Sequence, residues 1–334
     1  MVQAQRGEAI VRQGNELIQA SKAFTAEDVG RSWRHVLVTL LVLMLLQGVT
    51  LMHVWWPVRL VASVVLGLTI VRMFVLYHDY LHNGILRRSK LAKVIMVPFG
   101  LWVLTPPNVW RQTHNYHHAH TAKIVGSHVG SYPMVTTAMW REMTVPQRML
   151  YRFARHPMNI ALGYVTIFLY GMCISSFVRN PRKNWDSLAS VLLHGLLTAG
   201  FILWFGVPGW IYGLVLPMVV ACSSGAYLFY AQHNFEEVHV QPRHEWNYTD
   251  AALHSSSYMK LGPVMNWFTA NIGYHHVHHL NPTIPFYRLP EAMAAIPELQ
   301  APRVTTLRWK DIRACFRLKL WDPEQGRMVG FQGV

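Results

Sequence analysis

The chain has 334 residues, of which 52% are hydrophobic and only 14% are charged. This charged fraction is well below that of ordinary soluble domains, and several apolar runs are long, so we expect an all-α integral membrane protein. The formal charge is +14. Because the basic residues lie between apolar runs instead of forming a domain, they argue against nucleic-acid binding and favour lipid headgroups, cytoplasmic loops or an acidic protein partner.

Residues 1–33 are polar and mixed in charge, so they predict a cytosolic N-terminal segment without a signal peptide. Two apolar runs follow, at about 36–56 and 60–77, and each is long enough to cross a bilayer. Arg87, Arg88, Lys90 and Lys93 come after the second run. By the positive-inside rule, that end of the pair lies in the cytoplasm.

The next apolar stretch, 94–105, is too short to span and predicts an interfacial or buried element. Three further runs follow, at 160–178, 188–205 and 210–230. The histidine clusters described below flank these runs. If the clusters form one site, an even number of the runs must cross the membrane.

The loop after 160–178 carries Arg179, Arg182 and Lys183, whereas the turn Gly206–Gly209 is uncharged. The charge rule places the basic loop in the cytoplasm and the turn outside. We therefore expect 160–178 to dip into the membrane and the chain to have four full spans. A membrane domain over 34–300 would carry a cytosolic helical cap after Tyr230, followed by a cytosolic tail at 301–334.

Nine histidines fall in three clusters beside these runs: His78-x-x-x-His82, His114-x-x-His117-His118 and His275-His276-x-His278-His279. Residues three or four apart on a helix share one face, so each cluster can present two or three imidazole nitrogens to one point. Eight ligands are too many for one metal ion but suit two, and they exceed the needs of a structural or catalytic zinc site. A copper cluster remains an alternative. Only three cysteines are present, far apart, which argues against an iron–sulfur cluster.

Further candidates lie next to these clusters. His233 follows the last apolar run and is expected as a ninth ligand. Asp79 and Glu236 are interpreted as carboxylates that accept the outer N–H groups of bound imidazoles, and Glu237 as either such an acceptor or a solvated surface charge.

The other histidines are expected to have different roles. The spacing points His276 away from its neighbours, and His120 follows its cluster too late to join it. Packing or an interface is expected for His53 and His194. Surface or loop positions are expected for the rest: His35, His128, His156, His239, His244 and His254.

The three boxes, their order and their placement resemble the membrane-bound fatty acid desaturase superfamily. Two stretches, Phe229–Glu236 and Trp267–Pro282, are most similar to methyl-end acyl desaturases. The resemblance covers roughly residues 35–300. It implies a non-haem di-iron enzyme with four transmembrane helices, for example in a bacterial inner membrane, and a site on the cytoplasmic side. It also implies that O₂ and two electrons are used to introduce a double bond into a fatty acyl chain of a membrane lipid.

Electrons are expected from a separate donor, of ferredoxin or cytochrome b5 type with its reductase, because no haem-binding domain is visible in the sequence. A hydroxylase or ketolase of an alkane, acyl, sterol or carotenoid substrate could use the same ligands and is the alternative. A metal transporter would place its ligands near the middle of the bilayer, whereas these lie at the ends of apolar runs.

Overall fold

The structure is a computed structural model that describes residues 12–124 and 129–332. Parts of the predicted N-terminal segment and C-terminal tail, and His128, lie outside the described residues. The described chain is mostly helical. It also has two small sheets, so the expectation of an all-α fold needs a minor correction. One sheet is parallel, β1 (Tyr258–Met259) with β2 (Val304–Thr305), and the other is antiparallel, β3 (Leu320–Asp322) with β4 (Arg327–Val329).

Within residues 12–124 and 129–332, three helical stretches are long and apolar enough to cross a membrane. The first two are α2 (Val29–Leu51) and α3 (Trp56–Leu81), which pack against each other. Asp28 caps α2 by accepting a hydrogen bond from the Arg31 backbone N–H, which fixes where that helix begins. Of the three stretches, α3 is the most buried and forms the centre of the core.

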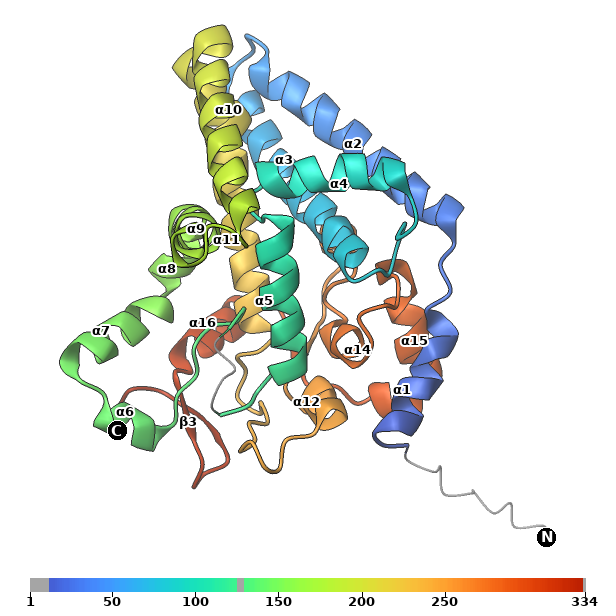
Figure 1. The fold of residues 1–334 in the computed structure, drawn as a ribbon, viewed down its shortest axis with the longest axis vertical. Helices are drawn as coiled ribbons and strands as arrows, with labels where there is room; N and C mark the ends of the chain where they lie inside the picture. Colours follow the sequence, from blue (N-terminus) through green and yellow to red (C-terminus); the bar gives the residue numbers. More distant parts are fainter. Residues whose placement is uncertain (1–11, 125–128, 333–334) are drawn as a thin grey trace.

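The third apolar stretch, Trp185–Ala231, contains α10 (Trp185–Trp210), the π-helical turn Ile211–Val215 and α11 (Leu216–Ala231). It is bent at Gly206, where φ is +68° and ψ is 179°, a conformation that side chains with a Cβ rarely adopt. After the bend the chain folds back, since Gly213 lies against the Phe201 ring (Figure 1). The bend coincides with the predicted turn Gly206–Gly209.

The apolar run at 160–178 forms shorter helices. These are α8 (Pro157–Ala161), a π-helix at Tyr164–Ser175 and α9 (Ser176–Arg179). Together the last two are shorter than a helix that spans a membrane. The loop that follows α9 leads directly into α10.

Two further helices, α4 and α5, lie beside these apolar stretches. Helix α4 (Lys90–Trp102) packs against α10 and contains Pro98, as expected for the short apolar element. Helix α5 (Pro107–His120) begins after Pro106 and runs beside the lower part of the bundle (Figure 1). Asn108 at its start donates its backbone N–H to the Asp186 carboxylate, which fixes α5 against α10.

Residues 235–332 fold over one end of the apolar helices (Figure 1). Helix α14 (His275–Leu280) packs against α12 (Tyr248–His254) and against α15 (Leu289–Ala295). The remaining described helices are α1 (Asn15–Ser21), η1 (Lys22–Phe24), α6 (Thr137–Glu142), α7 (Val145–Ala154), α13 (Pro263–Phe268), η4 (Phe286–Arg288), η5 (Pro297–Leu299) and α16 (Trp309–Arg317).

Candidate metal centre and apolar pocket

The three histidine clusters lie on helix ends that converge. The first occupies the last turn of α3 and its C-cap, the second the last two turns of α5, and the third all of the short helix α14. The structure brings eight of the nine clustered histidines together, and His233 joins them from the chain just after α11. These nine side chains divide into two groups.

Group 1 contains five histidines whose ligand atoms all lie within 4.8 Å of one another: His78, His82, His114, His118 and His278. The Nε2 atom of His114 lies 2.8 Å from Nε2 of His78 and 3.1 Å from Nε2 of His118. His278 closes the group, with its Nε2 atom 3.2 Å from that of His118. The group therefore draws on α3, α5 and α14.

Group 2 contains four histidines within the same limit: His117, His233, His275 and His279. Nε2 of His233 lies 3.1 Å from Nε2 of His117 and 2.9 Å from Nε2 of His275. Nε2 of His279 lies 3.2 Å from that of His275. Group 2 thus joins α5, α14 and the segment after α11.

The chemistry of these donors fits metal ions. Burial lowers the pKa of His114, His117 and His275 well below the usual histidine range, so these rings are neutral near neutral pH. The same cause lowers the pKa of His233 to about 4. Neutral imidazole is the metal-binding form. Several Nε2 atoms facing one point cannot all be satisfied by hydrogen bonds to one another, whereas a cation accepts all of their lone pairs.

The outer nitrogens of the rings have mixed surroundings. Nδ1 of His78 lies 3.3 Å from the Asp79 carboxylate, which also accepts the Phe286 backbone N–H at 2.7 Å. Nδ1 of His279 lies 3.4 Å from the Thr121 hydroxyl. Within the two groups, which lie wholly in the described residues, four buried Nδ1 atoms have no hydrogen-bond partner: those of His117, His118, His275 and His278.

The expected contact between Glu236 and the outer nitrogen of His233 is not formed. Glu236 is exposed, and Nδ1 of His233 instead lies 2.9 Å from the backbone carbonyl oxygen of Ser255. Glu237 forms an ion pair with Arg303 at 2.7 Å, as a surface charge would. The sequence did not indicate Ser255, because a backbone acceptor can come from any residue type and only the fold decides which one is near.

The other histidines lie apart from both groups. His276 is buried, but its Nε2 faces the Leu299 carbonyl oxygen at 3.1 Å. His120 stacks on Tyr116 with ring centroids 3.8 Å apart. The His194 side chain contacts the Tyr164 hydroxyl, and the half-buried His35 side chain contacts Arg72. Five further histidines are exposed: His53, His156, His239, His244 and His254. The His254 side chain is about half exposed.

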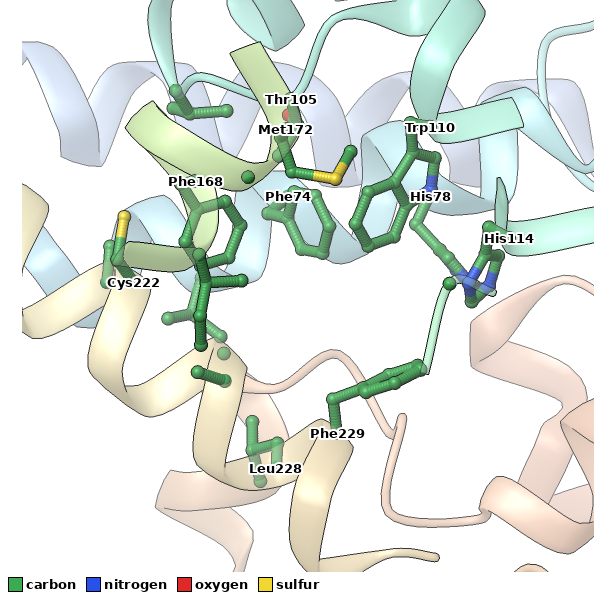
Figure 2. A pocket seen from close by; sticks show the side chains of 18 of the residues that line it. Phe74, His78, Thr105, Trp110, His114, Phe168, Met172, Cys222, Leu228 and Phe229 are labelled. Carbon is green, nitrogen blue, oxygen red and sulfur yellow. Dashed lines mark hydrogen bonds between the residues drawn. The ribbon is translucent and has the colours of Figure 1, made fainter. Parts of the chain in front are cut away.

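An apolar cavity of about 370 Å³ adjoins both groups. His78 and His114 of group 1 and His275 of group 2 all line it. The exposed surface of its wall is mainly apolar, and many of the other lining residues come from α3, the Tyr164–Ser175 π-helix and α11. In Figure 2 the two labelled histidines stand on one side of the cavity, with Phe74, Phe168 and Phe229 around it and Cys222 on the opposite side.

These features define a membrane-associated protein with two buried polyhistidine groups beside an apolar pocket, and comparison with known proteins agrees. The sequence matches the model of the fatty acid desaturase family over residues 54–310. The chain belongs to this family. The predicted enzyme class is confirmed: the chain is a fatty acid desaturase, an oxidoreductase.

Individual relatives support the same assignment. The chain is 27% identical to a fatty acid desaturase of Bacillus subtilis, over 85% of this chain and 80% of that protein. It is 23% identical to an sn-1 oleoyl-lipid 12-desaturase of Synechocystis, over 90% and 86% of the two chains. It is also 26% identical to an sn-1 acyl-lipid omega-3 desaturase (ferredoxin) of Nostoc, over 67% and 63%.

Proposed function

We propose that this desaturase uses two iron ions and O₂ to introduce a double bond into a fatty acyl chain of a membrane lipid. The observation that supports this most directly is the apolar cavity, which is lined by histidines of both groups. An acyl chain in the cavity would therefore pass next to both metal ions. The Synechocystis and Nostoc relatives are named as desaturases of lipid-linked acyl chains, which supports the same substrate class here.

Group 1 would hold one iron ion through five histidines and group 2 the other through four. When bound, the two ions supply the redox chemistry that uses O₂ to remove two hydrogens from adjacent methylenes. In the balanced reaction, –CH₂–CH₂– with O₂, two electrons and two protons gives –CH=CH– and two waters. Nine imidazoles contribute no negative charge, so the histidines would leave the positive charge of the two ions uncompensated.

The chain's own residues would control where the acyl chain reacts. Phe74, Phe168 and Phe229 line the cavity and exclude water from the acyl chain (Figure 2). Cys222 lies on the side of the cavity opposite the labelled histidines, so the acyl chain would extend between the two sides (Figure 2). Asp79, anchored by the Phe286 N–H, would keep the His78 ring oriented through its Nδ1.

We also propose four membrane crossings, with 160–178 dipping into the bilayer and the site on the cytoplasmic side. Support comes from the bend at Gly206, which allows Trp185–Ala231 to cross twice, and from the basic loop before α10. Residues 34–300 would then form the membrane domain, with 1–33 and 301–334 in the cytoplasm.

The two electrons would come from a separate protein. The Nostoc relative is named for ferredoxin, which supports a small iron–sulfur donor with its reductase. A cytochrome b5-type donor is the other option. The excess of basic residues in the chain would favour an acidic donor of either kind.

Expression in a host that lacks polyunsaturated lipids, followed by mass spectrometry of the membrane lipids, tests the proposal. We expect a new double bond in lipid-linked acyl chains and no product from a His114→Ala variant. Hydroxylated chains would favour the hydroxylase alternative. Unsaturation confined to acyl-CoA or free fatty acids would contradict the lipid-linked substrate.

A further inference from the structure

A third cluster of metal-binding side chains lies outside the two histidine groups. His239, Asp250 and His254 place one ligand atom each within 4.8 Å of one another. Nδ1 of His239 lies 2.9 Å from one Asp250 carboxylate oxygen, and Nδ1 of His254 lies 2.8 Å from the other. We propose that these three residues bind a divalent transition-metal ion, zinc being the best match, at a site separate from the catalytic centre.

The donor set suits such an ion. Two imidazoles and one carboxylate form a common binding set for divalent transition metals, with water in the remaining positions. Both rings turn Nδ1 toward the Asp250 carboxylate, so a metal ion that replaces the hydrogen-bonding protons would be held by both nitrogens and a carboxylate oxygen. The His239 and His254 side chains are about half exposed, at 50% and 52%, so an ion and its waters can reach the site from solvent.

The surrounding charges do not oppose a cation. Asp250 and His254 border a cavity of about 620 Å³, which Arg12 also lines. The Arg12 guanidinium is paired with Glu298 at 2.8 Å. Arg303, whose charge acts on His254, is paired with Glu237 at 2.7 Å. Both arginines are thus paired with carboxylates, and Asp250 supplies the negative charge within the cluster.

The cluster is also connected to group 2 through one residue. His239 donates its backbone N–H to the His254 carbonyl oxygen at 3.2 Å, and the Ser255 hydroxyl donates to the His239 carbonyl oxygen. The Ser255 carbonyl oxygen in turn faces Nδ1 of His233 at 2.9 Å. A metal ion bound by His239 and His254 would add to this backbone pairing, which two hydrogen bonds already hold without the ion.

Metal counting on the full-length, iron-loaded protein in detergent micelles tests the assignment. The protein is dialysed against micromolar zinc, and zinc and iron per chain are measured together. We expect about one zinc ion per chain in the wild type, and none in His239→Ala, His254→Ala or Asp250→Asn, with the iron content unchanged in all four. Cobalt offers a second probe, because its visible absorption would be lost in the same variants.

His244→Ala is the matched control, because His244 is an exposed histidine of the same loop that pairs with Glu245 and not with Asp250. It should keep the zinc ion. Equal zinc in wild type and in all three cluster variants would overturn the proposal, as would a wild type that takes up no zinc. If the wild type takes up no zinc, the three residues form a hydrogen-bonded cluster that binds no metal.

Discussion

His117 and His118 are neighbours in the sequence but belong to different groups. Nε2 of His118 lies 3.1 Å from that of His114, whereas Nε2 of His117 lies 3.1 Å from that of His233. Successive side chains on an α-helix point about 100° apart, so one turn of α5 faces both groups. Helix α14 does the same, with His278 in group 1 and His275 and His279 in group 2.

Single substitutions of the two neighbours should therefore affect different ions. Group 1 keeps four histidines after His118→Ala, but group 2 keeps only three after His117→Ala. We expect both variants to be inactive. His117→Ala should retain about one iron per chain, and His118→Ala should retain more than that. Iron analysis of the purified proteins checks this, and equal loss of both ions in the two variants would contradict the division into groups.

The segment after α11 gives a second prediction. His233 joins group 2 through its Nε2, while Glu236 is exposed and takes no part. We expect His233→Ala to lose iron and turnover, and Glu236→Gln to keep both close to wild type. His120→Ala serves as the control for removal of an imidazole, because that ring stacks on Tyr116 outside both groups. Full iron loading in His233→Ala would remove His233 from the ligand set.

The pocket can be shortened at Gly225 of α11, which lines the cavity and where an added Cβ would meet no atom within 4 Å. Valine there would occupy space that the acyl chain needs. We expect turnover of long chains to fall by about tenfold or more, or the double bond to move, as seen by lipid mass spectrometry. Iron content should not change.

Gly195→Val is the matched control for this substitution. Gly195 lies in α10, is exposed, and likewise has open space around an added Cβ, but it does not line the cavity. Valine is no worse a helix former than glycine, so neither variant should lose helix stability. Equal products from both variants would mean that the acyl chain does not use this part of the cavity.

The membrane topology can be tested with single introduced cysteines near the two ends of α10. The native cysteines Cys173, Cys222 and Cys315 are buried, so they should give little background labelling. A membrane-impermeant thiol reagent added outside cells should label Val207→Cys but not Lys183→Cys. Both positions are exposed, so accessibility depends on the side of the membrane. Labelling of Lys183→Cys from outside would mean that 160–178 crosses the bilayer.

The sequence by itself determined the enzyme family and the residues that gather at the centre. Residues three or four apart share one face of a helix. The sequence alone therefore predicts that His78 lies beside His82, and His114 beside His118. The bend at Gly206–Gly209 was also local, because an uncharged turn rich in glycine and proline interrupts an apolar run.

Only the tertiary structure decided how the histidines divide between the two groups, because that depends on how α3, α5, α14 and the segment after α11 meet. The same is true of the partner of His233. The sequence favours a carboxylate three residues away as the acceptor, but long-range packing brings the backbone carbonyl of Ser255 there instead. The cluster of His239, Asp250 and His254 likewise forms only when the loop folds back on α12, since side chains eleven residues apart have no fixed relation along the chain.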